Sequence, residues 1–269
     1  MNLMNFRTTI LALSTALLLD ACGGSGMETT TISVDRLMYG SVTTIVVGGI
    51  NLDKGITMVV PKCIGMTELP GGTPTQRVYT CTPDAVGDIQ ASVTGGGVTL
   101  HTTKLSIPQP RVNMKTSIGD VVLELDPAKA PISVKNFLQY VNANYYNNLI
   151  FHRVIPNFVI QTGGFDANLV RATPRAPIKL EVPNGLSNLR GTVAMARTTE
   201  ADSATSQFYI NVVDNVSLDS LGGGYAVFGK ALVGLDTVDA ISAVPTAVTN
   251  GMADVPVTAV TVLSMTQTQ

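Results

Sequence analysis

Short apolar runs with many β-branched residues alternate with turns through the first part of the chain. Such runs predict β-strands, here at residues 31–34, 43–47, 56–60, 77–81 and 89–93. Segments rich in glycine, or containing asparagine or proline, separate them as turns. The even spacing of these strands predicts a small β-sandwich, which we place at residues 29–106.

A second pattern begins after residue 110. Residues 121–125 alternate apolar and polar side chains behind a turn at 117–120, which predicts a β-hairpin. Further strands are predicted at 149–151, 158–161, 191–195, 207–212 and 226–228. Between the two patterns, Pro108 and Pro110 each remove a backbone donor and disfavour helix in the preceding residue. We therefore expect a stiff linker at 107–110.

Helical spacing appears twice in this second region. One run starts at Pro131, which suits a first helical turn, and places apolar residues at Val134, Phe137, Leu138 and Val141. The other run is shorter and uses Leu235, Val238 and Ile241. Two helices among about eight strands fit a closed barrel with capped ends. The predicted fold class is mainly β, a small β-sandwich followed by an eight-stranded β-barrel with two capping helices at 111–266.

The N-terminal segment predicts export. Residues 1–7 carry one basic side chain, and residues 8–19 form an apolar run of 12 residues, shorter than the roughly 20 needed to span a bilayer. A signal peptide at 1–21 is therefore favoured over a membrane helix. Residues 19–22, Leu-Asp-Ala-Cys, resemble a bacterial lipobox, although Asp20 stands where a small uncharged residue is usual.

The lipobox resemblance implies that Cys22 is lipidated and becomes the new N-terminus. Residues 22–28, which begin with a Gly-Gly-Ser-Gly run after the cysteine, would form a flexible tether. The expected location is the cell envelope, on the periplasmic side, with the protein anchored to a membrane. The alternative is an ordinary thiol beside a plain secretory cleavage site.

Two cysteines remain for the folded part, Cys63 and Cys81. Two thiols in an exported protein favour a disulfide, which would stabilise the fold by about 3 kcal/mol in the chain-entropy model. Two buried free thiols are the alternative.

Composition narrows the function. Hydrophobic residues make up 45% and charged residues 13% of the chain, so it can bury a core. The net charge of −2 gives no strong attraction to nucleic acid or to anionic membranes. We expect no nucleic-acid partner.

Residues 151–165 carry the clearest chemical signal. Arg153 and Gln161 lie among apolar and aromatic side chains, before the pair Gly163-Gly164. These glycines do not lie between a strand and a helix, so no phosphate loop follows. Nothing in the run suits metal binding or nucleophilic attack, and we expect no metal or cofactor. A guanidinium on an apolar groove instead suits a reaction in which no bond is made or broken.

Three blocks in order, at 151–164, 206–211 and 224–230, resemble the cyclophilin family of peptidyl-prolyl cis-trans isomerases (EC 5.2.1.8) over about residues 110–265. The resemblance implies a cyclophilin-like barrel that assists the folding of proline-containing envelope proteins, with Arg153 as the catalytic guanidinium. It implies further site residues: Gln161 to position the substrate and Arg153; Phe158, Val159, Tyr209 and Leu218 to hold the proline ring; Ala196, Arg197 and Gln207 to bind the peptide backbone; and Tyr225 at the histidine-or-tyrosine position.

Several positions differ from the best-known eukaryotic members. Val159 replaces a methionine, Tyr209 a phenylalanine, Arg197 an asparagine and Ser217 a tryptophan. The missing tryptophan predicts weak cyclosporin binding. The segments 196–198 and 224–225 resemble the bacterial periplasmic branch.

Residues 46–52, together with the two later cysteines, resemble an immunoglobulin-like module of adhesins or transcription factors. That domain would be a spacer or a partner-binding module, or a scaffold without a ligand.

Other interpretations remain open for single residues and for the whole chain. Taken alone, Arg153 could form a surface ion pair, and His152 is expected to be a structural hydrogen-bonding residue. Glu200, Asp202, Asp214 and Asp219 are expected to be solvated carboxylates near turns. The main alternative function is a non-catalytic module that binds proline-containing peptides or acts as a chaperone, and a purely structural envelope lipoprotein is a third. We expect a monomer.

Overall fold

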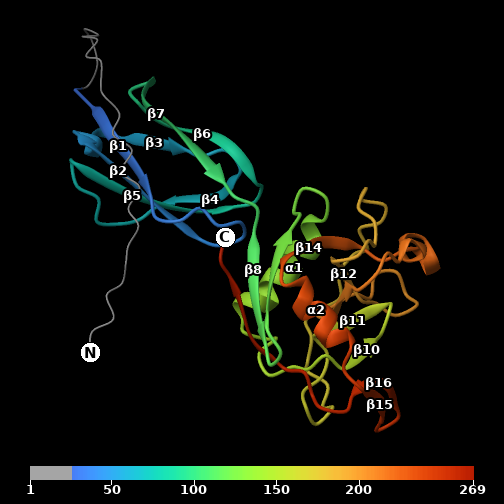
Figure 1. Cartoon of the computed structure of the whole chain (residues 1–269). Helices are drawn as coiled ribbons and strands as arrows, with labels where there is room; N and C mark the ends of the chain where they lie inside the picture. The colour runs from blue at the N-terminus through green and yellow to red at the C-terminus, as the bar shows by residue number, and fades with distance from the viewer. Residues whose placement is uncertain (1–25) are drawn as a thin grey trace, which may run out of the picture. The chain divides into compact units, whose positions relative to one another are not determined.

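The computed structural model describes residues 26–269, so the predicted signal peptide, Cys22 and most of the predicted tether lie outside the described part. The chain divides into two compact domains between Pro108 and Gln109, inside the linker predicted at 107–110. Figure 1 shows the N-terminal domain in blue to teal and the C-terminal domain in green to red.

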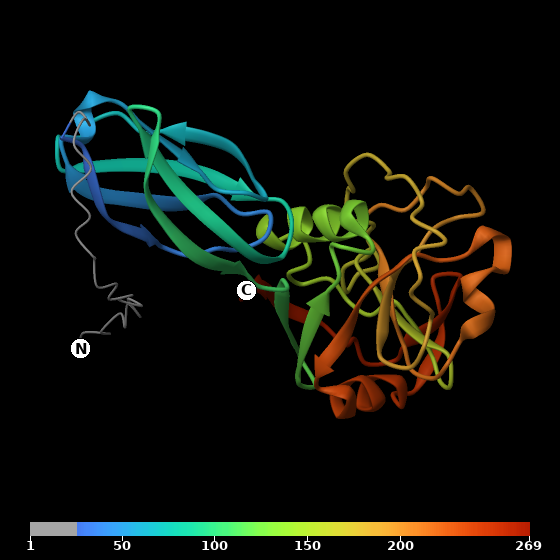
Figure 2. The same ribbon diagram turned by 90° about the horizontal axis from the view of Figure 1, so that it is seen from above.

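The N-terminal domain consists of two antiparallel sheets. One sheet has the strand order β1 (Glu28–Val34), β2 (Thr43–Ile50), β5 (Gln76–Pro83), β4 (Cys63–Glu68). The other has the order β3 (Ile56–Val59), β6 (Gly87–Gly95), β7 (Val98–Ile107), and the short 3-10 helix η1 (Leu52–Lys54) precedes β3. The two layers are visible in Figure 2. This is the small β domain that the sequence predicted, although β4 and β7 were not anticipated.

Period-two alternation builds the core of the N-terminal domain. On β6 the side chains of Ile89, Ala91 and Val93 are buried while their neighbours are more exposed, as expected for a strand with one face on a core. Ile45 and Val47 on β2 supply the opposite layer. A disulfide joins Cys63 on β4 to Cys81 on β5, with 5.7 Å between their Cα atoms.

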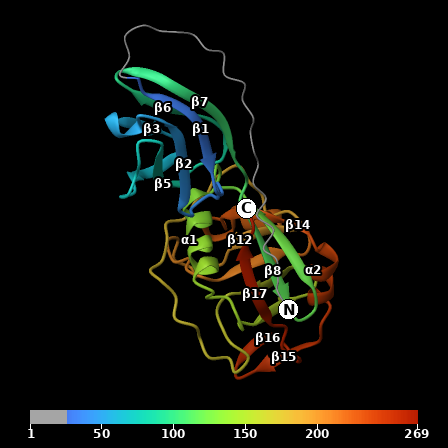
Figure 3. The ribbon, with the colours of Figure 1, turned by 90° about the vertical axis from the view of Figure 1, so that its left-hand side faces the viewer.

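The C-terminal domain is built on one curled sheet of eight strands. Its order is β10 (Arg153–Ile155), β11 (Val159–Thr162), β13 (Phe208–Asn211), β12 (Thr192–Met195), β14 (Val227–Val233), β9 (Asp120–Leu125), β8 (Arg111–Thr116), β17 (Val262–Gln267). Figure 3 shows β17 in red beside β8 in green, so the last strand of the domain pairs with the first.

Isolated bridges complete the curl. Residues 149–151 were predicted as a strand, but they form single bridges, Leu149 with Asp166 and Ile150 with Thr261. Through residues 149 and 150, these bridges connect the segment after β11 to the residue just before β17, the strand at the other edge of the sheet. The result is the predicted eight-stranded barrel architecture, with irregular pairing where the ring closes.

Two helices cover the curled sheet. Helix α1 (Pro131–Asn142) contacts β14 and β17, whereas α2 (Leu235–Ser242) contacts β9, β10 and β11. They lie at opposite ends of the domain in Figure 2. Both helices occur where the apolar spacing predicted them. The smaller elements are η2 (Val216–Asp219), η3 (Leu221–Gly223) and the hairpin of β15 (Thr246–Thr249) and β16 (Met252–Pro256).

Aromatic rings fill the C-terminal core. Phe137 of α1 lies 5.2 Å from Phe208 in an edge-to-face contact and 5.2 Å from Phe228, between centroids, and Tyr146 packs against the same group. Edge-to-face pairs of this kind add about 0.5–1.5 kcal/mol beyond burial. Phe208 thus faces the core, as alternation along β13 predicted, and leaves Tyr209 for the other face.

Within residues 26–269, no helix is both long enough and apolar enough to cross a bilayer.

Candidate active site

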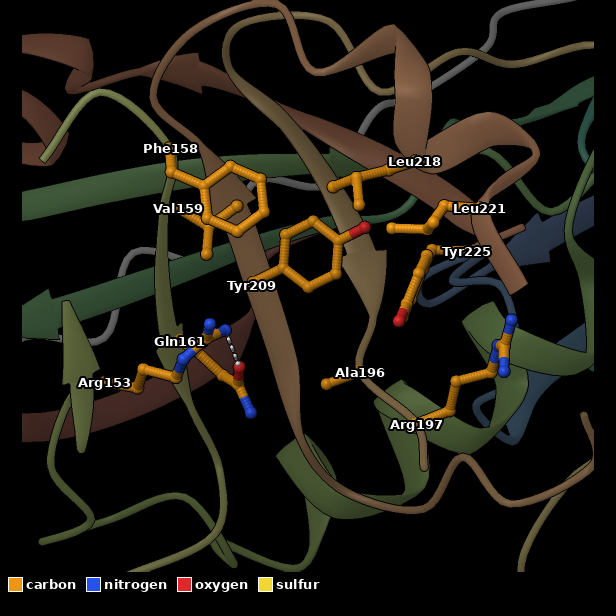
Figure 4. Close-up of a pocket in the computed structure, with 10 residues that line it drawn as sticks. All are labelled: Arg153, Phe158, Val159, Gln161, Ala196, Arg197, Tyr209, Leu218, Leu221 and Tyr225. Carbon is orange, nitrogen blue, oxygen red and sulfur yellow. Dashed lines mark hydrogen bonds between the residues drawn. The ribbon is translucent and has the colours of Figure 1, made fainter. Parts of the chain in front are cut away.

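A pocket of about 260 Å³ opens on the face of the sheet opposite Phe208. Ten residues line it, nine of which the sequence had indicated as site residues. They are Arg153, Phe158, Val159, Gln161, Ala196, Arg197, Tyr209, Leu218, Leu221 and Tyr225 (Figure 4).

The floor of the pocket is apolar. Val159, Tyr209 and Leu218 belong to one buried cluster, and Phe158 packs against it from the rim. Strands β11 and β13 place Val159 and Tyr209 in this cluster. In their ladder Val159 lies opposite Asn211, and Gln161 lies opposite Tyr209. A half-open apolar hollow of this size can hold a pyrrolidine ring by burial alone.

Arg153 lies on the edge strand β10, directly opposite Gln161 on β11. Its Nη1 donates to Gln161 Oε1 at 3.4 Å, a long bond that leaves most of the guanidinium donors free (Figure 4). Among the described residues no carboxylate forms a salt bridge with Arg153, so the surface ion-pair interpretation does not describe it here. The guanidinium is available to a ligand in the pocket.

Beside the pocket, the side chains of Gln161 and His152 share one acceptor on Gln207. Gln161 Nε2 donates to Gln207 Oε1 at 2.9 Å, and His152 Nε2 lies 3.1 Å from the same oxygen. A carbonyl oxygen only accepts, so His152 must carry its proton on Nε2. Gln207 just precedes β13, is half-buried and is not among the residues that line the pocket; its hydrogen bond orients Gln161.

His152 is held in the neutral form. It is 3% exposed, and burial lowers its pKa from 6.5 to about 4 although the hydrogen bond with Gln207 opposes the shift. It is therefore not poised for acid-base chemistry near neutral pH, in agreement with the structural role expected for it. Glycine at position 164 leaves room for the Gln207 side chain, because a Cβ there would lie 2.7 Å from Gln207 Cδ.

A buried polar network fixes the far wall of the pocket. The Tyr209 hydroxyl donates to Asn188 Oδ1 at 2.8 Å, and Asn188 Nδ2 donates to Asp219 Oδ1 at 2.8 Å. Asp219 also accepts from the backbone N–H of Asn188 and from the Ser187 hydroxyl. Since Asp219 ends η2, which carries Leu218, one carboxylate ties that wall to Tyr209.

Asp219 lies near a turn as expected, at the end of η2, but it is half-buried and accepts hydrogen bonds from Ser187 and Asn188, so it is not simply solvated. Burial by itself would raise the pKa of Asp219, but the hydrogen bonds from Ser187 and Asn188 outweigh it and lower the pKa. Burial also raises the pKa of the Tyr209 hydroxyl, which stays protonated and donates. Sequence spacing could not reveal the pairing, because Asn188 and Asp219 lie 31 positions apart.

Arg197 and Tyr225 form the remaining wall. The Arg197 guanidinium lies over the Tyr225 ring, 4.6 Å from its centroid, and donates to the Gly222 and Gly224 carbonyls. Leu221 is the lining residue that the sequence did not indicate. A leucine in a glycine-rich turn has no periodicity that would mark it.

Residues 26–269 contain no group of three or more His, Cys, Asp or Glu side chains that could hold a metal ion.

Comparison with known proteins agrees with this geometry. The profile of the family "Cyclophilin type peptidyl-prolyl cis-trans isomerase/CLD" matches residues 111–267. A peptidyl-prolyl cis-trans isomerase of Acinetobacter baylyi is 54% identical over 57% of this chain and 83% of its own length. Peptidyl-prolyl cis-trans isomerase B of Escherichia coli is 48% identical over 58% of this chain and 98% of its own length.

A solved structure is also similar. A cyclophilin-type isomerase of Cryptosporidium parvum, crystallised in the presence of the dipeptide Ala-Pro, has a TM-score of 0.50 and 25% identity, and the match covers 59% of this chain and 99% of that one. All of these matches fit a region the size of the C-terminal domain. With a family profile matched over more than half of its length, this chain belongs to the cyclophilin-type peptidyl-prolyl cis-trans isomerases.

Proposed function

We propose that the pocket catalyses prolyl isomerisation, with the proline ring on Val159, Tyr209 and Leu218 and the Arg153 guanidinium at the twisting amide nitrogen. The observation that carries the proposal is the Arg153 guanidinium, which forms no salt bridge with any carboxylate of residues 26–269 and lies beside an apolar hollow. The Cryptosporidium relative crystallised with Ala-Pro supports a proline-containing ligand.

The chemistry follows from the electronic change in the amide. The planar amide is held by resonance, and rotation costs about 18–20 kcal/mol. Midway, the nitrogen becomes pyramidal and regains a lone pair. A donor aimed at that nitrogen gains a partner only in the transition state, so it lowers the barrier without tightening the ground state. Arginine is suited to this because it stays charged and presents a rigid set of donors.

Arg153 supplies part of the effect. A charged hydrogen bond is worth about 1.5–3 kcal/mol, or roughly one to two powers of ten in rate. Gln161 contributes by holding Arg153 and offering its own amide to the substrate carbonyl side, and it is itself fixed by Gln207. The partly dry floor strengthens these interactions.

An isomerisation assay on a proline tetrapeptide tests the proposal. Arg153→Ala should lower kcat/KM by at least about tenfold, because the transition-state hydrogen bond is lost. Arg77→Ala in the N-terminal domain, which removes a salt bridge with Glu68, is the control and should have full activity. Equal rates for the Arg153 variant and the wild type would rule out this mechanism, and binding of proline peptides without acceleration would favour the non-catalytic alternative.

We further propose that the protein works in the cell envelope as a periplasmic lipoprotein anchored through Cys22. The supporting features are the short apolar run at 8–19 and the lipobox-like segment at 19–22. Uncatalysed prolyl isomerisation takes tens of seconds or more, which is slow enough to limit folding of exported chains. Labelling with radioactive palmitate tests the anchor, and Cys22→Ala should abolish the label and release the protein into the soluble fraction.

For the N-terminal domain we propose an immunoglobulin-like spacer between anchor and enzyme, in a monomeric protein. Its two-sheet arrangement and its cross-strand disulfide support the immunoglobulin-like part of this proposal. Sedimentation of the soluble Cys22→Ala protein tests the monomer. We also expect weak cyclosporin binding, since Ser217 on η2 replaces a bulky indole; nanomolar inhibition would contradict it.

A further inference from the structure

The loop that follows η2 contains three consecutive glycines with positive φ. Gly222, Gly223 and Gly224 have φ angles of 60°, 98° and 89°, a region that glycine enters without the steric cost other residues meet. At Gly224 a Cβ would also lie 2.5 Å from the Asp219 carbonyl oxygen. Such a segment loses much conformational entropy on ordering, so contacts from outside it help to fix its position in addition to its own backbone hydrogen bonds.

Arg197 supplies those contacts. Its Nε donates to the Gly224 carbonyl at 2.9 Å and its Nη2 to the Gly222 carbonyl at 2.6 Å. Its Nη1 donates to the carbonyl of Thr198, the next residue in the chain. The planar face of the guanidinium stacks on Tyr225 at the end of the loop. Each of the three guanidinium nitrogens therefore donates one hydrogen bond to the protein itself, and two of the five N–H groups remain for other partners.

The anchored loop presents Leu221 at the pocket. Leu221 lines the pocket although it is 59% exposed, whereas Leu218 on the floor is 5% exposed. In Figure 4 the Leu221 side chain extends toward Leu218 and Tyr209. Since the buried floor is assigned to the proline ring, the exposed Leu221 is positioned for the side chain next to proline.

We propose that Leu221 is a specificity-determining residue that favours substrates with an apolar side chain adjacent to proline, and that Arg197 is the positioning residue that holds it there. The inference rests on the proposed function of the pocket. Covering part of the apolar surface of an exposed leucine gains most when the flanking residue is apolar, because a polar flanking side chain loses its own hydration in the same contact. That surface corresponds to about a three- to tenfold preference in kcat/KM.

Four peptides test the preference: leucine or serine before proline, and leucine or serine after it, in a protease-free assay that follows isomer exchange by NMR. The readout is the leucine-to-serine ratio of kcat/KM at each flank, which also tells which flank Leu221 contacts. The wild type should show a ratio of about three to ten at one flank. Leu221→Ser should reduce that ratio to about one. Leu263→Ser, a change of the same kind at an exposed position on β17 outside the pocket lining, should keep the wild-type ratio.

Arg197→Gln separates positioning from direct peptide binding. If Arg197 acts through Leu221, its variant also loses the ratio, and the double variant with Leu221→Ser loses no more than either single one. If the guanidinium binds the peptide backbone, kcat/KM falls equally for all four peptides and the ratio stays. That second result would overturn the positioning role.

The inference and the proposed function fail differently. A wild type that shows no preference at either flank, or a Leu221→Ser protein with an unchanged ratio, would overturn the inference while the Arg153-dependent exchange persists. No acceleration of exchange for any of the four peptides, or acceleration that survives Arg153→Ala unchanged, would instead overturn the proposed function.

Discussion

The two domains differ most in what they bury. Among the described residues, the N-terminal domain buries only two polar side chains, Thr29 and Thr43. The C-terminal domain buries many more, and several of them surround the pocket: His152, Asn188, Asn211 and Asn215. Both domains are mainly β, so the difference does not follow from the type of secondary structure, and the residues around the pocket account for part of it.

The difference shows how a pocket is kept in shape. Apolar packing is non-directional and fills space, whereas hydrogen bonds fix the distance and orientation of the groups that they join. A buried polar group without a partner costs about 1–3 kcal/mol, so a network with matched partners excludes other arrangements. Asn188 joins Tyr209, Asn211 and Asp219 in this way. The part of the N-terminal domain that the structure describes buries no comparable group of polar side chains.

The domains also stabilise their cores differently. The N-terminal core is chiefly aliphatic and is cross-linked by Cys63 and Cys81. The C-terminal core depends on aromatic rings around Phe137. This contrast predicts domain-specific responses, which calorimetry on the full chain can separate into two transitions.

Phe137→Ala should produce the largest effect. It removes a fully buried ring that contacts Phe208, Phe228 and Tyr146, and such substitutions cost about 3–5 kcal/mol. We expect the C-terminal transition alone to move to lower temperature. The matched change in the other core, Leu52→Ala, should lower only the N-terminal transition. A joint shift of both transitions with either variant would show that the domains do not unfold independently.

Removing the disulfide should have the second-largest effect on stability. The bond closes a loop with a sequence separation of 18, so Cys63→Ser with Cys81→Ser should cost the N-terminal domain about 3 kcal/mol. The measurement is urea denaturation with and without reducing agent. Isomerase activity should stay unchanged because the pocket lies wholly in the other domain. Loss of activity in the reduced protein would argue that the first domain takes part in catalysis.

Acidification should weaken the C-terminal domain alone. The pKa of His152 is lowered from 6.5 to about 4 by burial, so in that interval the unfolded chain binds the proton and the folded domain does not. The stability contribution is complete above pH 6.5 and is lost as the pH falls toward 4, by about 1 kcal/mol per pH unit.

His152→Asn should flatten this slope, and His101→Gln in the N-terminal domain is the control for loss of a histidine. The pKa values of Asp219 and Asp239 are lowered from 3.8, so their contributions are lost below that pH and leave the interval clear. An unchanged slope in the His152 variant would show that another group titrates there.

Tyr209→Phe should give the smallest effect, a loss of about 1 kcal/mol in the unfolding free energy of the C-terminal domain. The loss is small because Asn188 Oδ1 keeps its hydrogen bond from Asn211 Nδ2. Tyr79→Phe is the matched change in the N-terminal domain, where the hydroxyl makes only a 3.4 Å contact with Glu68, and we expect less than half of that loss. Equal losses from the two variants would contradict the special role given to the polar network.

Much of the fold was predictable because apolar periodicity reports burial directly. The α1 and α2 positions, the β8–β9 hairpin and the strands β2, β5, β6 and β12 all follow from local patterns. The strands that were missed, such as β4, β10 and β17, are short or irregularly paired. Residues 149–151 have the apolar pattern of a strand, but their partners come from two distant segments and form only single bridges.

The sequence by itself determined the class of chemistry. Arg153 and Gln161 lie in one apolar run, and this run and two later blocks resemble the cyclophilin family. Together they predicted nine of the ten residues that line the pocket. Only the tertiary structure decided what each side chain does there. Gln207 lies behind Gln161, Arg197 bonds to its own glycine loop, and Asp219 anchors a wall. The physical reason is that a side chain's role depends on which donors and acceptors face it, and those come from segments whose separation along the chain carries no periodic signal.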